Sequence, residues 1–186
     1  VWYDCLEYVR RHRPRLVLFE NDLGMWYRNR DCFDFIVWIL TYFDYVVKWR
    51  VLDTRDPGIP HRRQRLYIIG FQASRYDGSF QWPNPVRNTP KLQHLLDAKN
   101  MDTHKQQLPY GCQKNRRLII KNFYELCHGY GVDPRDHDIV LDVDSSIRFT
   151  DWTFDEMPCL TAARGRSHGL WVTSRSRPLT TGELLR

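Results

Sequence analysis

The sequence has little of what marks a membrane, exported or metal-binding protein. Its longest apolar run, residues 35–47, is too short to span a bilayer and contains Asp44. The first residues lack the charged-then-apolar order of a signal peptide. The five cysteines form no CxxC pair, and Cys112 and Cys127-His128 have no partner at zinc-site spacing, so we expect reduced thiols and no metal. An initiator methionine is also missing, and the sequence is expected to be a piece of a longer protein.

What the sequence has is enough apolar material for a core and an uneven charge. Hydrophobic residues make up 42% of the 186 and aromatic residues 14%, which indicates a globular chain. The formal charge of +6 makes polyanion binding plausible. Residues 161–186 hold five arginines against Glu183 alone, whereas residues 133–156 hold eight acids against Arg135 and Arg148. This separation suggests one face for an anion and another for solvent or a partner.

The first part of the chain reads as half of an open α/β sheet. The apolar patterns predict, in order, an amphipathic helix over 1–13, a short buried strand over 16–19, a well-buried helix over 32–43, and strands over 45–53 and 66–71. After residue 71 the composition changes, and residues 72–158 read as a second, irregular α/β module. Near the end, Thr180 and Glu183 have the spacing of a capping box that starts a helix.

Two polar clusters lie next to predicted strands. Glu20 and Asn21 follow the first strand, at the rim where α/β folds bind ligands. The loop "GIPHRRQR" crowds His61 and several arginines just before the strand 66–71, where their mutual repulsion must be offset. Each cluster alone also fits a plain reading: Glu20 is a water-exposed acid, and the loop is a solvated turn or pairs with Asp53 and Asp56.

Together the clusters resemble motifs of the cytosine-C5 DNA methyltransferases. "LVLFENDLG" is similar to that family's Glu-Asn strand, and "GIPHRRQRLYIIG" to its Gly-x-Pro-Gln-x-Arg-x-Arg segment, with His61 where Gln is usual. "RPLTTGELLR" resembles its Arg-x-Leu-Thr-x-x-Glu segment. The three motifs occur in the family's order. The resemblance covers residues 1–71 and about 157–186 and says little about the middle.

The resemblance implies a fold and a division of the chain. The expected fold is α/β: the C-terminal half of a Rossmann-like S-adenosylmethionine-dependent methyltransferase sheet plus a small irregular α/β target-recognition module. Residues 1–71 would form part of the catalytic domain, 72–174 the target-recognition region, and 175–186 a return segment to the catalytic domain.

The resemblance also implies roles in catalysis. Methylation at carbon 5 of cytosine needs a nucleophile at carbon 6 and electron flow toward N3. An acid such as Glu20 can donate to N3, and a guanidinium near O2, here Arg65, stabilises the same charge. Arg63 would order the site or contact a phosphate. The target base must leave the duplex to reach these groups.

Further residues are expected to bind the substrate. Asn21, His61 and Arg62 would contact the flipped cytosine or its phosphates. Thr161 would lie near the flipped nucleotide's backbone. Arg164, Arg166, Arg175 and Arg177 could contact phosphates, although each could equally be part of a basic surface that touches nothing specific. The implied partner is double-stranded DNA with a flipped cytosine, bound by a monomeric full-length protein located inside the cell with its DNA, in the nucleus if the host is eukaryotic.

Parts of the family pattern are missing from the sequence. Pro158-Cys159 is rejected as the nucleophile, because it follows the Glu-Asn strand instead of preceding it, and Cys5 is rejected because no proline precedes it. No Gly-rich strand-to-helix turn is present to cradle S-adenosylmethionine, so the cofactor site is expected mostly outside this chain. The chain is therefore expected to be inactive alone.

Three interpretations remain open. The chain is a fragment of an active DNA methyltransferase, a non-catalytic DNA-binding relative in which Asp22 and His61 are signs of decay, or part of an RNA cytosine methyltransferase.

Overall fold

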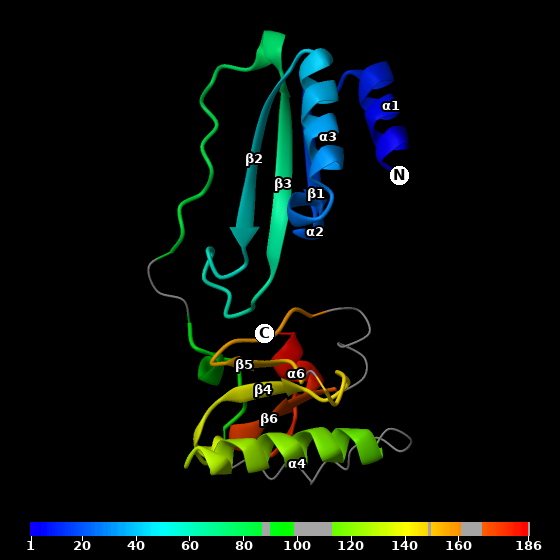
Figure 1. The fold of residues 1–186 in the computed structure, drawn as a ribbon. Helices are drawn as coiled ribbons and strands as arrows, with labels where there is room; N and C mark the ends of the chain where they lie inside the picture. Colours follow the sequence, from blue (N-terminus) through cyan, green and yellow to red (C-terminus); the bar gives the residue numbers. More distant parts are fainter. Residues whose placement is uncertain (87–89, 99–112, 149, 161–168, 186) are drawn as a thin grey trace. The chain divides into compact units, whose positions relative to one another are not determined.

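The computed structural model describes residues 1–86, 90–98, 113–148, 150–160 and 169–185 (Figure 1). The chain divides into two compact units. The first consists of Val1–Pro57 and Gln64–Pro85, and the second of Gly58–Arg63 and Val86–Arg186. The first unit thus continues past residue 71, where the sequence predicts a domain boundary, and the loop 58–63 groups with the second unit.

The first unit is built on a three-stranded antiparallel sheet with the order β1-β3-β2. Its strands are β1 (Leu16–Asn21), β2 (Tyr45–Asp53) and β3 (Gln64–Gln72). β3 is central: it pairs with β2 over its whole length and with β1 over Leu66–Phe71. Successive side chains along a strand point to opposite faces of the sheet, and residues paired across strands point to the same face. The strand pairing therefore shows which face each side chain occupies.

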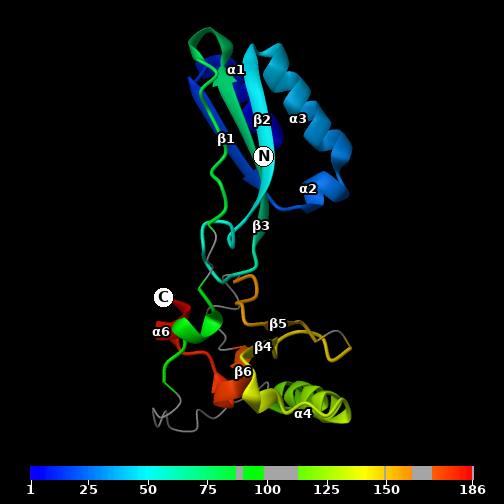
Figure 2. The same cartoon turned by 90° about the vertical axis from the view of Figure 1, so that its left-hand side faces the viewer.

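Three helices cover one face of this sheet (Figures 1 and 2). They are α1 (Trp2–His12), α2 (Gly24–Tyr27) and α3 (Arg30–Tyr42). Their buried residues pack with those of the strands into one core, formed by Leu6, Val9, Val17, Met25, Phe33, Ile36, Leu40, Tyr45, Leu66 and Ile68. The amphipathic helix predicted over 1–13 is present as α1, and its apolar side is buried in this core through Leu6 and Val9.

Gly70 in the central strand leaves room for the side chains of Val17 in β1 and Tyr45 in β2. A Cβ atom added at Gly70 would lie 2.6 Å from Cγ2 of Val17 and 3.3 Å from Cδ1 of Tyr45. The hydroxyl of Tyr45 donates to the carbonyl of Pro14 at 2.6 Å, which fixes the ring over this position. Glycine is required at this site by packing density and not by an unusual backbone angle.

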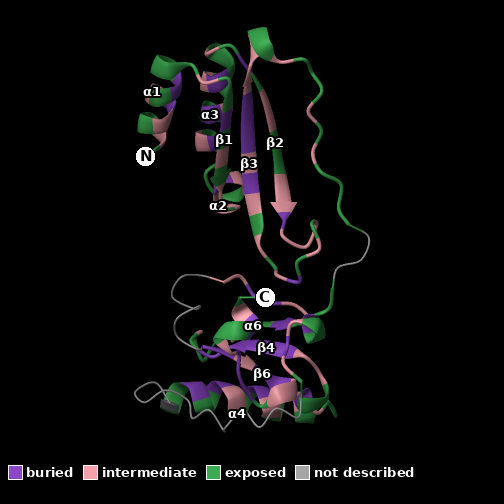
Figure 3. Cartoon of the chain, turned by 180° about the vertical axis from the view of Figure 1, so that it is seen from behind, coloured by how far each residue is buried: buried purple, intermediate pink, exposed green. Residues whose placement is uncertain are grey.

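Two elements are less buried than their sequences predict (Figure 3). β1 was expected to be a buried strand, but Leu16 and Leu18 are 53% and 60% exposed. Both point away from the helices, and β1 is the edge of the described sheet, so nothing described covers them. α3 was expected to be well buried, but only Phe33, Ile36 and Leu40 are, because its opposite side, with Phe35, Trp38 and Tyr42, contacts solvent.

The second unit contains a four-stranded antiparallel sheet with the order β5-β4-β6-β7. Its strands are β4 (Ile139–Asp142), β5 (Trp152–Phe154), β6 (Leu170–Val172) and β7 (Arg177–Pro178). β4 is buried along its length and contributes to both layers of core. Val140 faces one layer, and Ile139 and Leu141 face the other.

Each face of the second sheet has its own cover. The long helix α4 (Gln113–Gly129) packs Ile119 and Phe123 against Ile139 and Leu141 (Figure 1). The other face is covered by the 3₁₀ turn Leu92–His94 and by Leu179, which precedes the short helix α6 (Thr181–Leu184). The predicted capping box is confirmed: the Thr180 hydroxyl accepts from the Glu183 amide, and the Glu183 carboxylate accepts from the Thr180 amide.

Both units therefore mix helices with antiparallel sheets, which agrees with the expected α/β class at this coarse level. In the part of the chain that the structure describes, no helix is both long and apolar enough to cross a membrane.

Candidate functional site

The clearest site-like contact in the first unit joins an acid and a guanidinium that are far apart in sequence. Nε of Arg65 lies 2.8 Å from Oε1 of Glu20. The Glu20 side chain is 45% exposed and that of Arg65 is 21% exposed. Arg65 also donates from Nη1 to the carbonyl of Gln64 at 2.7 Å, which orients its guanidinium. A half-exposed pair of this kind is accessible to a ligand.

Strand register explains why these two residues meet. Glu20 in β1 lies opposite Tyr67 in β3, and Arg65 is two positions from Tyr67 on the same strand. Residues two apart on a strand share a face, so Glu20 and Arg65 are diagonal cross-strand neighbours. Both lie on the face that α1, α2 and α3 do not cover, since the core residue Leu66 points the other way. The structure therefore brings Glu20 and Arg65 together on one face of the sheet.

Asn21 does not join them. Its amide nitrogen lies 3.6 Å from the sulfur of Met25, a core residue, on the opposite face of the sheet. Its Oδ1 accepts from the Asp22 amide at 2.8 Å, and Asp22 in turn accepts from the Gly24 amide at 2.7 Å. Asn21 and Asp22 therefore shape the turn from β1 into α2.

The loop residue His61 is held by residues 157–160. Its Nε2 accepts from the Leu160 amide at 3.0 Å. A single parallel β-bridge joins His61 to Met157, with hydrogen bonds from the Arg62 amide to the Met157 carbonyl and from the Met157 amide to the Pro60 carbonyl. These contacts lie within the second unit. His61 thus organises chain segments 60–62 and 157–160.

Arg63 has the same neighbours. Its Nη1 lies 3.5 Å from the carbonyl of Leu160 and 3.6 Å from Sγ of Cys159. Arg62 is exposed. Asp53, one of the two carboxylates that could pair with the loop arginines, forms an ion pair at 2.7 Å with Arg55, which precedes the loop.

The predicted phosphate contacts divide into two groups. Thr161, Arg164 and Arg166 lie outside the described residues. Arg175 and Arg177 are described and have internal partners. The Arg175 side chain is 10% exposed, donates to the Asp97 carbonyl and lies 3.6 Å from Asp138.

Arg177 is the most enclosed of the predicted site residues. It donates to both carboxylate oxygens of Glu183, at 2.8 and 2.6 Å, and the two side chains are 8% and 0% exposed. Burial alone would raise the pKa of Glu183, but hydrogen bonds from Arg177, Thr180 and the Asp97 amide lower it to about 2. The Glu183 interaction likewise raises the pKa of Arg177. Arg177 therefore has its partner, Glu183, inside the second unit.

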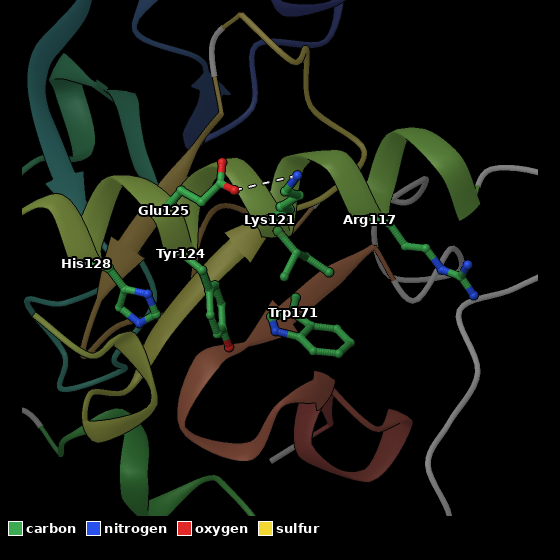
Figure 4. Close-up of a pocket in the computed structure, with 7 residues that line it drawn as sticks. Arg117, Lys121, Tyr124, Glu125, His128 and Trp171 are labelled. Atoms are coloured by element: carbon green, nitrogen blue, oxygen red, sulfur yellow. Dashed lines mark ion pairs between the residues drawn. The ribbon is translucent and has the colours of Figure 1, made fainter.

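One feature of the second unit was missed by sequence reasoning. A groove of about 550 Å³ runs between α4 and β6, lined by Ile120, Tyr124 and Trp171 with Arg117, Lys121, Glu125 and His128 (Figure 4). The signal was present in "RRLIIKNFYELC": buried and half-buried residues recur at helical spacing, and cations occupy the outer side.

The chain belongs to the C-5 cytosine-specific DNA methylase family, which matches it over residues 1–186. It is 29% identical over 103 residues to the type II methyltransferase M.DsaV of Dactylococcopsis salina, covering 53% of this chain and 29% of that relative. It is 27% identical over 132 residues to M.HhaI of Haemophilus parahaemolyticus, covering 64% of this chain and 40% of the relative. M.HpaII of Haemophilus parainfluenzae is 27% identical over 108 residues, which cover 55% of this chain and 30% of the relative. The chain thus spans less than half the length of these curated relatives.

Proposed function

We propose that the protein containing this chain transfers a methyl group from S-adenosylmethionine to carbon 5 of a cytosine flipped out of double-stranded DNA. In this proposal Glu20 and Arg65 contact the base. The single observation that supports it best is their 2.8 Å ion pair on the uncovered face of the first sheet. Family membership supplies the reaction class.

The geometry suits the edge of a pyrimidine. N3 and O2 are neighbours on the cytosine ring, so groups that contact them must lie side by side, as the carboxyl of Glu20 and the guanidinium of Arg65 do. When a nucleophile adds to carbon 6, negative charge develops toward N3 and O2. A proton shared between Glu20 and N3, and a hydrogen bond from Arg65 to O2, stabilise that charge where it forms.

The described residues do not form a cradle for the methyl donor. β1 passes into α2 through Asn21, Asp22 and Leu23, a turn closed by Asp22 and without the glycines of a nucleotide-binding turn. No step is therefore assigned to the cofactor. The described thiols of the first unit, Cys5 and Cys32, lie on helices that cover the face opposite to Glu20 and Arg65. We expect the 186 residues alone to be inactive.

Asp22 and His61 depart from the family pattern, and each has a structural role. This favours an active enzyme over a non-catalytic relative. Asp22 caps the Gly24 amide at the start of α2. His61 accepts a hydrogen bond from Leu160, so it supplies an acceptor as a glutamine carbonyl would. Neither substitution disturbs its surroundings.

Several finer parts of the proposal rest on the family resemblance. They are the Rossmann-like origin of the first sheet, the target-recognition role of residues 72–174, and nucleotide or phosphate contacts by His61, Arg62, Arg63, Thr161 and Arg164. A monomeric protein located with its DNA completes the proposal.

The test is methyl transfer in the full-length protein with Glu20 replaced by Gln. We expect turnover in a tritium-transfer assay to fall by about 100-fold or more, the usual contribution of a positioned acid, while DNA affinity stays within a few-fold. Glu7→Gln is the matched control, because Glu7 also pairs with arginines but lies on α1. Turnover of Glu20→Gln near the wild-type level would disprove the role of Glu20.

A further inference from the structure

The groove beside α4 lies along a line of cations. Lys114, Arg117 and Lys121 occupy positions i, i+3 and i+7 of the helix, so they share one side, and all three are exposed. The helical rise places Arg117 about 4.5 Å from Lys114 and about 6 Å from Lys121 along the axis. A straight row of three cations matches the repeating charge of a nucleic-acid strand, and no compact anion would contact all three.

The floor of the groove is aromatic. Tyr124 and Trp171 lie on the same side of α4, with Ile120 between the helix and the sheet (Figure 4). The hydroxyl of Tyr124 points to the Thr173 carbonyl, with 3.5 Å between the two oxygens. Aromatic rings that border a row of cations are the usual combination for binding unpaired nucleotides, because every base can stack on them.

Trp171 adds a second observation. Its indole Nε1–H is buried, and it has no hydrogen-bond acceptor among the residues that the structure describes. A buried donor without an acceptor costs free energy. Trp171 therefore keeps an unsatisfied donor beside the groove that its ring helps to line.

One carboxylate opposes this use of the groove. Glu125 lies 3.6 Å from Nζ of Lys121, and the side chains are 63% and 69% exposed. Such an exposed pair contributes little and is easily exchanged for a phosphate contact. Lys114, Arg117 and Lys121 still outnumber Glu125 on this side of the helix.

We propose that the α4–Trp171 groove binds an unpaired stretch of DNA, with phosphates along Lys114, Arg117 and Lys121 and a base stacked against Tyr124 and Trp171. The groove would bind this strand in addition to the cytosine contacted by Glu20 and Arg65. A duplex fits less well, because its bases are stacked on one another and not available to the rings. The choice of DNA over RNA rests on the function proposed above.

The first experiment measures the phosphate contacts. Binding of a labelled single-stranded deoxyoligonucleotide of about 12 nucleotides, within the range of known single-strand sites, is followed by fluorescence anisotropy in the full-length protein. Replacing both Arg117 and Lys121 by Ala should weaken binding about 10-fold at low salt. It should reduce the slope of log affinity against log salt by about 1.4, since each lost phosphate contact removes about 0.7.

Two single substitutions complete this experiment. Glu125→Gln should tighten binding about two-fold by removing the opposing charge. Lys91→Ala is the control, because Lys91 is an exposed cation that caps the 3₁₀ turn on the opposite face of the second sheet. Equal affinities for wild type and the double variant would overturn the proposal.

The second experiment measures stacking. The wild-type protein should bind the oligonucleotide about 10-fold more tightly than an abasic oligomer of the same length, because the abasic oligomer has phosphates but nothing to stack. Trp171→Leu should lose most of this preference and Trp171→Phe should retain it. The comparison within the wild-type protein needs no variant to fold, and equal binding of the two oligomers would disprove base stacking in the groove.

The two proposals fail separately. If the oligonucleotide effects are absent but methyl transfer still depends on Glu20, only the proposal for the groove is overturned. Intact oligonucleotide effects with turnover independent of Glu20 would overturn only the proposed function.

Discussion

Two arginine–glutamate pairs, one in each unit, have the same chemistry and different surroundings. Arg65 and Glu20 meet on an open sheet face, with side chains 21% and 45% exposed. Arg177 and Glu183 meet inside the second unit, with side chains 8% and 0% exposed. Glu183 also accepts from the amides of Asp97 and Thr180. Both pairs lie in segments that resemble motifs of one family, so motif membership alone does not tell a substrate contact from a structural one.

Burial and the number of hydrogen bonds separate the two roles. A carboxylate that accepts from three groups in the interior has no capacity left for a ligand, and its loss leaves an unpaired guanidinium. A half-exposed pair gains little from its mutual attraction and can exchange it for a bound base. The comparison therefore predicts opposite effects of substitution on stability and on activity.

The largest effect is expected from Glu183→Gln. It leaves Arg177 buried without its counter-charge, so the free energy of unfolding should fall by about 3–5 kcal/mol. Urea denaturation measures this loss. Replacing Arg177 and Glu183 together by leucine should recover a large part of it, since no unpaired charge remains. A loss below about 1 kcal/mol is the range of surface ion pairs. It would show that Arg177–Glu183 contributes no more to stability than the exposed pair Arg65–Glu20.

Arg65→Ala should act on catalysis instead. Removing one donor that stabilises developing charge should lower methyl transfer by the full-length protein about 100- to 1000-fold. The free energy of unfolding should change little, because the described partners of the guanidinium, the Glu20 carboxylate and the Gln64 carbonyl, belong to exposed residues. Arg50→Ala is a matched control, as Arg50 lies opposite Tyr67 on the same face. Turnover of Arg65→Ala equal to that of the control contradicts the assignment.

Acid should weaken the buried pair specifically. The pKa of Glu183 is about 2 in the folded chain and about 4.5 ordinarily. A lowered folded pKa stabilises the fold above the unfolded pKa, and this stabilisation is lost as pH falls from about 4.5 toward 2. The difference between these two pKa values corresponds to about 3 kcal/mol. Between pH 5 and pH 2, wild type should therefore lose more unfolding free energy than Glu183→Gln.

Glu7 makes this pH experiment sharper. Hydrogen bonds from Arg10 and Arg11 also hold the pKa of Glu7 at about 2, but its side chain is 41% exposed on α1. Solvent screens that pair, so Glu7→Gln should leave the acid sensitivity of the wild-type protein almost unchanged. Equal effects of Glu7→Gln and Glu183→Gln would show that burial is not the distinguishing property.

The smallest effect is expected from Glu20→Gln on stability. The exposed pair with Arg65 should contribute no more than about 1 kcal/mol to the free energy of unfolding. Thermal and urea denaturation of the variant test this. A loss as large as that of Glu183→Gln would make Glu20 a structural residue and remove the contrast between the two pairs.

The first unit was largely predictable from its sequence because its signals are local. The strand Tyr45–Asp53 has the predicted bounds. α3 begins two residues before the predicted helix 32–43 and ends one residue before it. β3 begins two residues before the predicted strand 66–71 and ends one residue after it. The opposite direction of Asn21 was not predicted, because the strand was expected to end at residue 19 whereas β1 continues to Asn21. The pairing of Glu20 with Arg65 came from the resemblance, since no local pattern brings β1 beside β3.

The second unit was less predictable because its order depends on distant contacts. α4 was not predicted as a separate helix within the irregular module expected over residues 72–158, and its outer side, with Arg117 and Lys121, was not connected to Trp171 in β6. Arg177 was taken for a surface cation because nothing local shows that Glu183 and the Asp97 amide enclose it. Charge counts along the sequence measure composition and carry no information on burial.

The exposed edge of β1 has a practical consequence for handling the chain. Leu16 and Leu18 flank the buried Val17 on a strand whose outer backbone groups have no strand partner among the described residues. An open apolar edge is a template for adding further strands from neighbouring molecules. Purified on its own at high concentration, the chain should precipitate through this edge, and a lysine at position 18 should keep it in solution.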